Sequence, residues 1–439
     1  MATMYLQAQY GHSPARERIW LGKILYSIET ISKSYVLSAL SAKSPDPACE
    51  TIQFPFFRAA DCPVETLSRY FSNLPSFQST SEWIIESSVR EGCIFMDELR
   101  KINFFSQRCS TKDQYLFYIA SCFVASNNRD GRFLSAKHLF MLLEIAVAGY
   151  QLDNFMDGDL MRFTTAEVND IGKFVSKCFD HLDTTDGEFA NIERSTPGSP
   201  CECTTHNAKK QIIDFIRWML AKRASDYDRM NLENELKAAL VAHISHVTAS
   251  HQLQESNPRS NGCQILPLAM RRQTYYHWLR RSASDSILYP LVLKYMICHC
   301  HMGARGGDTD VFRSAKEKYI IEDICRHAAA EARLWNDHGS VERDRKEGIL
   351  NSCAFLELHA LSTGDHEVKS NRQGGINDIL VELARYENRH VQLCLDEFER
   401  ASEGMDHQDL ISRVRMFQLV TQVWNEMYSI SKFDAKSVP

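Results

Sequence analysis

The stretch Leu334-Trp-Asn-Asp-His-Gly-Ser-Val-Glu-Arg-Asp-Arg-Lys-Glu-Gly348 is the most informative part of this chain. Its residues Asn336, Ser340 and Asp344 follow one another at intervals of four, so on a helix their side chains stack on one face. An amide oxygen, a hydroxyl and a carboxylate on one stripe form an all-oxygen ligand set that suits Mg²⁺. The stretch therefore predicts a helix that carries half of a metal site.

Two basic residues, Arg343 and Lys346, lie in the same turns. Basic side chains are expected beside a metal whose other ligand is a phosphate group, because they neutralise phosphate oxygens. Each of them would fit a solvated helix face equally well. The pattern as a whole predicts one half of a site for Mg²⁺ and a diphosphate, with Arg343 and Lys346 as candidate diphosphate contacts.

A second acidic stretch, Tyr150-Gln-Leu-Asp-Asn-Phe-Met-Asp-Gly-Asp159, supplies the other half. Asp153 and Asp157 are four residues apart and share a helix face. The preceding run Leu139–Gly149 is apolar almost all round, which is typical of a buried helix. Carboxylates that end a buried helix need a partner, and metal ions are one such partner. An acidic pair alone is usually a solvated face, so this interpretation depends on the first stretch.

Together the two motifs resemble those of class I terpene cyclases, in which an aspartate-rich motif and an N-x3-S/T-x3-D/E motif face each other across a helical bundle. More closely, the chain resembles the C-terminal class I half of fungal bifunctional copalyl diphosphate/kaurene synthases. It is also similar to the free-standing, brasilane-type (trichobrasilenol synthase-like) sesquiterpene cyclases of fungi. The segments that carry the likeness are Ile19–Tyr26, Asn127–Leu134, Tyr150–Asp157 and Asn336–Gly348.

The resemblance implies an enzyme that ionises an allylic diphosphate with the help of three Mg²⁺ ions and cyclises the resulting carbocation. It assigns catalysis and metal binding to Asp153, Asp157, Asn336, Ser340 and Asp344. One position departs from the family, because its second acidic residue is Asn154 here. Metal binding at the first motif must then rest on Asp153 and Asp157.

A third segment, Thr274–Ser286, combines aromatic residues, two arginines and a run of small residues, which suggests a helix that breaks. In class I cyclases a broken helix in this region carries an arginine that contacts diphosphate. By resemblance Arg280 or Arg281 fits that role, and the sequence does not separate them. An arginine pair is otherwise usually found on the surface.

Aromatic side chains are candidates for the wall of a hydrocarbon pocket, where they would stabilise a cation through their ring faces. Ordinary core packing is the competing interpretation for each of them. The candidates are Phe123, Phe155, Trp335, Trp424 and Tyr428.

The composition narrows the class of protein. The chain has 439 residues, a net charge of −6 and a pI of about 6.3, which gives no reason to expect nucleic acid as a partner. Its 14 cysteines and the absence of a secretory signal favour a reducing cytoplasm. Cys201–Cys203 and Cys298–His301 lack the second ligand pair of a zinc finger, and no apolar run is long enough to span a membrane.

Helical periodicity dominates the chain, and alternating strand patterns are scarce. We expect an all-α, single-domain class I terpenoid synthase bundle over residues 1–439, with a central active-site cavity, no class II region, and surface loops at 183–207 and 254–262. Monomer and homodimer both remain open. The expected helices span Arg16–Ala42, Pro63–Phe71, Ser79–Phe95, Gln114–Val124, Ala136–Met156, Thr165–Leu182, Lys209–Lys222, Leu232–Ser250, Gln273–Leu279, Ser286–Cys300, Ala315–Gly348, Ile376–Ser402 and Gln408–Ser431.

The leading expectation is a sesquiterpene cyclase acting on farnesyl diphosphate, because the chain looks like a class I module standing alone. The runner-up is a diterpene synthase that uses geranylgeranyl or copalyl diphosphate. A prenyltransferase would usually carry two aspartate-rich motifs, whereas the second motif here is Asn/Ser/Asp. A catalytically degenerate helical scaffold is conceivable because of Asn154. The sequence shows neither the product skeleton nor whether water quenches the final cation.

Overall fold

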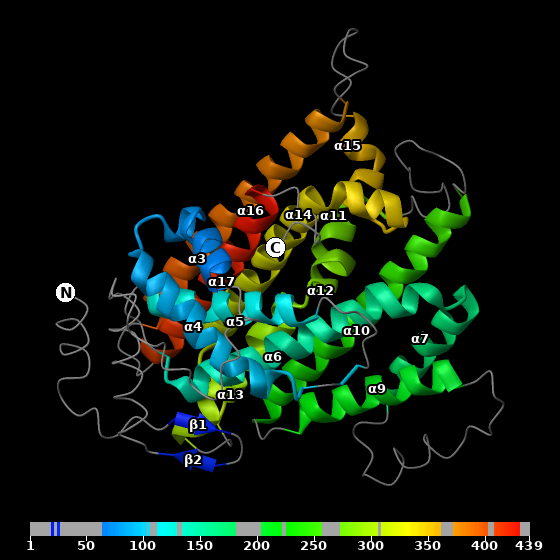
Figure 1. Ribbon diagram of the computed structural model, residues 1–439. Coiled ribbons are helices and arrows are strands. Elements are labelled where there is room, and N and C mark those ends of the chain that lie inside the picture. Colours follow the sequence, from blue (N-terminus) through cyan, green and yellow to red (C-terminus); the bar gives the residue numbers. More distant parts are fainter. Residues whose placement is uncertain are drawn as a thin grey trace, which may run out of the picture. The chain divides into compact units, whose positions relative to one another are not determined.

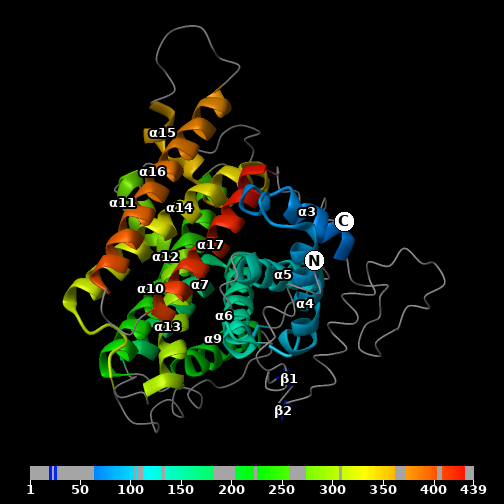
Figure 2. The ribbon, with the colours of Figure 1, turned by 90° about the vertical axis from the view of Figure 1, so that its left-hand side faces the viewer.

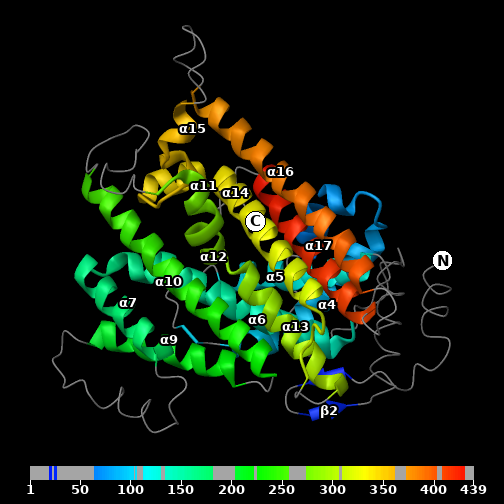
Figure 3. The same ribbon diagram turned by 180° about the vertical axis from the view of Figure 1, so that it is seen from behind.

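The fold is known from a computed structural model (Figures 1 and 3). It describes residues 19–21, 24–26, 64–102, 104–105, 112–129, 134–180, 203–221, 225–256, 273–305, 309–360, 372–402 and 408–430. Most of these residues lie in helices, so the prediction of an all-α fold is confirmed for the part of the chain that the structure describes. The α-helices are α3 (Val64–Ser72), α4 (Glu82–Leu99), α5 (Lys112–Arg129), α6 (Ala136–Asn154), α7 (Thr165–Asp180), α9 (Cys203–Leu220), α10 (Asp226–Ser256), α11 (Tyr275–Trp278), α12 (Ser284–Ser286), α13 (Tyr289–Arg305), α14 (Ala315–Glu347), α15 (Leu356–Ala360), α16 (Arg372–Ala401) and α17 (Gln408–Ile430).

Short helical turns of other kinds connect some of these helices. Two of them are π-helical, η4 (Phe155–Asp159) and η7 (Leu279–Ala283). The 3-10 turns are η3 (Pro75–Phe77), η5 (Leu160–Arg162) and η8 (Ser352–Ala354).

The helix predicted at Arg16–Ala42 is wrong where the structure describes it. Strands β1 (Ile19–Leu21) and β2 (Ile24–Tyr26) pair antiparallel, with Leu21 opposite Ile24. The apolar residues of this stretch satisfy a helical spacing, but they flank Gly22 and Lys23, and a two-residue connection that begins with Gly is typical of a hairpin. Turn chemistry therefore outweighed periodicity, and the rest of the predicted helix lies outside the described residues.

The residues fall into two compact units. The first comprises 1–102 and 110–144, and the second comprises 103–109 and 145–438, apart from Pro439, which is grouped with the first. The prediction of a single domain therefore stays a prediction. Every candidate site residue except Phe123 belongs to the second unit.

The predicted surface loops, 183–207 and 254–262, include residues that are helical in the structure. α9 begins at Cys203 and α10 continues to Ser256, so residues 203–207 and 254–256 are helical. The remainder of each predicted loop lies outside the described residues. Helix ends are poorly marked in a sequence, because the terminal turns carry few buried side chains.

α14 is the longest helix of the second unit, and its ends are set by local sequence. Ser314 Oγ accepts a hydrogen bond from the Glu317 amide at 3.1 Å, and Glu317 Oε2 accepts one from the Ser314 amide at 3.1 Å. This capping box starts the helix. Gly348, with φ at 71°, ends it in the left-handed conformation that glycine adopts without strain. The predicted span Ala315–Gly348 is thus confirmed, and the Asn336 motif occupies its last turns.

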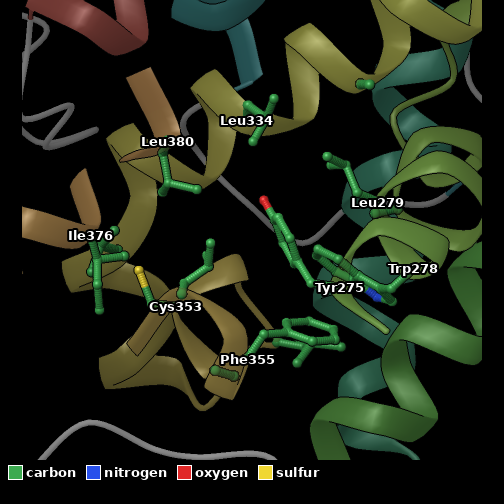
Figure 4. Packing of buried hydrophobic residues seen from close by; sticks show 14 of the residues in the cluster. Tyr275, Trp278, Leu279, Leu334, Cys353, Phe355, Ile376 and Leu380 are labelled. Atoms are coloured by element: carbon green, nitrogen blue, oxygen red, sulfur yellow. The ribbon is translucent and has the colours of Figure 1, made fainter. Parts of the chain in front are cut away.

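α14 packs against α16 and α17 on one side (Figure 2). Towards α11, a hydrophobic cluster joins it to the segment that follows Gly348. Figure 4 shows the rings of Tyr275, Trp278 and Phe355 together, with Leu334 of α14 and Leu380 of α16 nearby. The ring centroids of Trp278 and Phe355 are 4.6 Å apart. This cluster fixes the position of α14 against the segment predicted to contain a helix break.

A buried carboxyl group in the α14–α16–α17 interface gives a prediction about stability. Glu331 is 2% exposed, and burial raises its pKa from 4.5 to about 7. The folded state therefore holds the proton more tightly than the unfolded state, so stability falls as the pH rises from about 4.5 to about 7. We expect Glu331→Gln, which keeps an acceptor for Asn388, to be more stable than the parent by about 2–3 kcal/mol at pH 8 and by no more than about 1 kcal/mol at pH 5.

Urea denaturation at pH 5 and pH 8 checks this expectation. The exposed Glu382, on the neighbouring helix α16, is the matched control. In Glu382→Gln, the free energy of unfolding should change between pH 5 and pH 8 by the same amount as in the parent. An unchanged pH dependence in Glu331→Gln would show that Glu331 is ionised in the folded state.

Candidate active site

The Asn336 motif lies on the C-terminal part of α14 as predicted. Ser340 and Asp344 are buried, and Asn336 is half-buried. Ser340 Oγ donates to Asp344 Oδ2 at 2.5 Å, so the hydroxyl and the carboxylate are neighbours on one helix face. This is the arrangement that the four-residue interval predicts.

Asp344 receives hydrogen bonds on both carboxylate oxygens. Arg343 donates to Oδ1 through Nε at 3.1 Å and through Nη2 at 2.9 Å. Asn351 Nδ2 donates to Oδ2 at 2.9 Å, beside the bond from Ser340. These donors give both oxygens of Asp344 hydrogen-bond partners, as a side chain that is only 1% exposed requires.

The segment that follows Gly348 folds back onto α14 and supports the motif. Asn351 Nδ2 also donates to the Asp337 carbonyl at 3.0 Å, and Asn351 Oδ1 accepts from the Cys353 amide at 3.1 Å. Ser352 donates to Asp337 Oδ2 through its amide at 2.8 Å and its hydroxyl at 2.5 Å. Asp337 is paired with Arg333, 2.8 Å away. These bonds orient the turns of α14 on either side of Ser340.

The first motif begins in the last turn of α6. Asp153 is half-buried there, whereas Asp157 lies in the π-helical turn η4, and its side chain is outside what the structure describes. Asn154, the position that departs from the family, donates through Nδ2 to the Tyr150 carbonyl at 2.9 Å. This bond uses the amide nitrogen only, and metal binding that rests on the two aspartates stays a prediction.

Tyr428 of α17 lies within electrostatic reach of both motifs. Burial raises the pKa of Tyr428, and the charges of Asp153 and Asp344 raise it further. The charge of Arg343 and a hydrogen bond with the Asn336 side chain oppose this rise. The Tyr428 side chain is thus near enough to Asp153 of α6 and Asp344 of α14 to feel both charges, which supports a common location for the two motifs.

α10 contacts the segments that carry both motifs. His251 Nε2 is 3.1 Å from the Met161 carbonyl, which follows the first motif. Gln254 Nε2 donates to the Glu347 carbonyl at 2.9 Å, and Ser250 Oγ accepts from the Leu350 amide at 3.0 Å. One stretch of α10 therefore holds the ends of both segments, which provides independent support for their convergence.

The close approach of α17 to α14 depends on Gly339. A Cβ at this position would lie 3.0 Å from the carbonyl oxygen of Tyr428 and 2.8 Å from its ring. We expect Gly339→Ala to push α17 away and to cost about 1–3 kcal/mol, because a well-packed interface does not accept an extra methyl group. Thermal or urea denaturation measures the cost.

Gly158 is the matched control for this substitution. It is exposed, and a Cβ there would meet nothing within 4 Å. Gly158→Ala should leave stability unchanged or slightly raised, because alanine restricts the unfolded chain. Equal effects of the two substitutions would contradict a tight Gly339–Tyr428 contact.

The helix break predicted in the third segment is present. α11 passes into the π-helical turn η7 and the short α12, and Leu288 then takes a φ of 63° before α13 begins at Tyr289. A Cβ on Gly149 would lie 3.6 Å from Leu288, so the break packs against α6 one turn before Asp153. The two π-helical turns of the described chain thus lie in two of the three segments singled out from the sequence, as is frequent at functional sites.

The two arginines of η7 have different surroundings. Arg280 Nη2 donates to Glu387 Oε1 of α16 at 2.7 Å, and Arg280 Nη1 lies 3.3 Å from His327 Nδ1. Arg281 is exposed, and its charge lowers the pKa of Asp285 against the larger upward effect of burial. The prediction that either arginine contacts diphosphate stays a prediction, and Lys346 is likewise an exposed residue whose role stays one.

The aromatic candidates are spread over several elements. Phe155 stacks on Phe105 with ring centroids 4.7 Å apart, and Trp335 packs against the hydrophobic cluster of α14. Trp424 is half-buried on α17. Phe123 is buried in α5 of the first unit. That any of them lines a hydrocarbon pocket, and that the pocket is central, stay predictions.

Sequence reasoning missed the residues that support Asp344. Asn351 and Ser352 follow a helix end, where polar residues are common and carry no distinguishing pattern. Arg333 and Asp337 are four residues apart with opposite charges, and that spacing could have identified the ion pair.

The described chain has few places where acidic, histidine or cysteine side chains cluster. No group of three or more His, Cys, Asp or Glu residues there could hold a metal ion by itself. A metal at the convergence of the motifs would therefore need the amide of Asn336 and the hydroxyl of Ser340, and hard oxygen donors of this kind fit Mg²⁺. Cys201 and His301, from the two candidate zinc segments, fall outside the described side chains. Among the described helices, none is both long and apolar enough to cross a membrane.

The amino-acid sequence is similar to those of several fungal terpene synthases. It is 25% identical to pimaradiene synthase of Emericella nidulans over 94% of this chain and 44% of that protein. It is 23% identical to ent-kaur-16-ene synthase of Fusarium fujikuroi, over 95% of this chain and 44% of that protein. With phyllocladan-16-alpha-ol synthase of Phomopsis amygdali the identity is 25%, over 96% of this chain and 45% of that protein.

The chain is homologous to fungal terpene synthases. It spans about 44% of the length of the first of these relatives. No protein-family profile matches it. Among solved structures, it is weakly similar to linalool/nerolidol synthase of Streptomyces clavuligerus, with a TM-score of 0.44 and 13% identity over 79% of this chain and 95% of that one. It is similarly related to cucumene synthase, with a TM-score of 0.43 and 12% identity over 78% and 95%.

Proposed function

We propose that this terpene synthase homologue is a Mg²⁺-dependent class I cyclase that ionises an allylic diphosphate and cyclises the carbocation to a hydrocarbon or alcohol. The observation that carries the proposal is the convergence of Asp153 with Asn336 and Asp344 around Tyr428. That acidic residues from distant parts of the chain act on one tyrosine supports a shared site over an accidental pattern on two solvated faces.

The chain's own residues would divide the work as follows. Asp153, Asp157, Asn336, Ser340 and Asp344 would hold three Mg²⁺ ions, the number that the family resemblance implies. When bound, these ions would supply Lewis-acid neutralisation of the leaving diphosphate. Arg343, Lys346 and one of the η7 arginines would donate hydrogen bonds to its oxygens.

Of the two η7 arginines, Arg281 is the better candidate for diphosphate. The guanidinium of Arg280 is bound to Glu387, whose carboxylate is buried and also 2.7 Å from His327. Moving Arg280 to a substrate would leave that buried charge with only the histidine, which is costly. Arg281 has no such penalty because its side chain is exposed.

Farnesyl diphosphate is the first substrate we propose, from the likeness to brasilane-type cyclases. A twenty-carbon substrate is the second candidate, because the curated relatives that the chain matches include a pimaradiene synthase, an ent-kaur-16-ene synthase and a phyllocladan-16-alpha-ol synthase. We further propose a cytoplasmic location. The two substrate classes differ in the depth of pocket they need, so product analysis separates them.

The test is incubation of the purified protein with Mg²⁺ and, separately, farnesyl, geranylgeranyl and copalyl diphosphates, followed by gas chromatography–mass spectrometry. A cyclic fifteen-carbon product supports the first candidate, and twenty-carbon products alone support the second. A further incubation with farnesyl and isopentenyl diphosphates together, dephosphorylated before analysis, would give a longer linear alcohol if the protein were a prenyltransferase. Turnover that survives EDTA, or no product from any substrate, would contradict the proposed cyclase.

A further inference from the structure

The carboxylate of Asp344 has no free position for a metal ion. A carboxylate offers about four lone-pair positions. Here they are taken by Arg343 Nε and Nη2, by Ser340 Oγ and by Asn351 Nδ2. A cation that binds to Asp344 must therefore displace at least one of these donors.

Two of the three donor residues are fixed in place. Asn351 is 6% exposed and its amide group also bonds to the Asp337 carbonyl at 3.0 Å and to the Cys353 amide at 3.1 Å. Ser340 is buried, and the proposed site needs it as a ligand. Displacing either would leave a buried polar group without its partner.

Arg343 is the donor that can leave. Its side chain is 51% exposed, whereas that of Asp344 is 2% exposed. A long arginine side chain that is half in solvent can withdraw without disturbing the helix. It is also the one donor whose charge would repel an incoming cation.

We propose that Arg343 is an internal cation that occupies Asp344 until a metal ion replaces it at Oδ1. This inference rests on the proposed function, because it assumes that Asp344 binds metal. The released guanidinium becomes available to the diphosphate, so metal binding prepares the arginine for substrate. Metal binding then raises the affinity for diphosphate by some factor. Because coupling between two ligands is reciprocal, diphosphate bound to Arg343 must raise the affinity for metal by that same factor.

The competing interpretation is that the Arg343–Asp344 pair is permanent and orients the carboxylate for metal. The two interpretations predict opposite signs. If Arg343 competes with metal, its removal tightens metal binding in the absence of substrate. If Arg343 orients Asp344, its removal weakens metal binding.

The experiment titrates the full chain with Mn²⁺ and follows the free ion by electron paramagnetic resonance, with and without inorganic diphosphate. We expect Arg343→Gln to bind Mn²⁺ about two- to fivefold more tightly than the parent without diphosphate, the size of an exposed ion pair. Added diphosphate should raise Mn²⁺ affinity less in the variant than in the parent. Equal or weaker Mn²⁺ binding by Arg343→Gln overturns the inference.

Two further variants separate the possible failures. Arg345 is the matched control, because it lies on the same helix, is exposed and pairs with Glu342 at 2.8 Å. Tighter Mn²⁺ binding by Arg345→Gln as well would point to a general loss of positive charge and would also overturn the inference. In Asp344→Asn, Mn²⁺ binding should weaken sharply. Unchanged binding there would contradict the metal site itself, and with it the proposed function.

Discussion

Replacing Asn336 with alanine is expected to lower cyclase turnover by at least about a thousandfold, since a lost metal ligand removes several kcal/mol of transition-state stabilisation. Asn336 is the cleanest of the three α14 ligands to test. Its side chain is half-buried, and its described hydrogen bond is to Tyr428. Asp344 is a poorer choice, because its removal strips partners from three buried or half-buried donors.

The measurement is product formation at saturating Mg²⁺, with circular dichroism as the check on folding. Glu342 on the same helix is the matched control, because it is exposed and pairs with Arg345. Glu342→Ala should keep its turnover within about twofold, as expected of a surface substitution. Full activity of Asn336→Ala would remove the second motif from the mechanism.

Most helices could be predicted from the sequence because their apolar residues repeat at the helical interval over many turns. α14 is the strongest example, since Ser314, Glu317 and Gly348 mark both of its ends. The hairpin at Ile19–Tyr26 was missed because a short apolar stretch satisfies both periods. In the sequence, Gly22 between the two apolar runs favours a hairpin.

The ligands of the candidate site could be predicted for a similar reason. Asn336, Ser340 and Asp344 form a local pattern on one helix, and a local pattern is visible in a sequence. The contacts that shape the site are not local. Tyr428 meets Asn336 across 92 positions of the chain, and Asn351 reaches back to Asp344 from beyond the helix end. Such contacts depend on tertiary packing, which periodicity does not encode.

The ion pair between Arg343 and Asp344 could not be predicted from the sequence either. In the sequence, a basic residue beside a ligand aspartate suggests either a contact with phosphate or a solvated helix face. The structure shows the same guanidinium on the aspartate itself. Both contacts can belong to one residue at different stages of binding, which is why the order of metal and diphosphate binding is worth measuring.

The sharpest test of the first motif compares neighbours on α6. Asp153→Ala is expected to lower turnover by at least about a hundredfold, because the remaining motif residue, Asp157, would have to hold metal alone. Asn154→Ala is expected to stay within about threefold of the parent, since metal binding at this motif is proposed to rest on Asp153 and Asp157 and the Asn154 amide nitrogen bonds only within the helix. Both residues are half-buried, so their effects on folding should be similar.

The two variants should be compared by initial rate over a range of Mg²⁺ concentrations. If Asp153 holds metal, its variant should need more Mg²⁺ for half-maximal rate, and the Asn154 variant should follow the parent curve. A large loss in Asn154→Ala would mean that its amide oxygen serves as a ligand in place of the family's second aspartate. Equal, small losses in both would place the diphosphate-binding metal entirely on the α14 side of Tyr428.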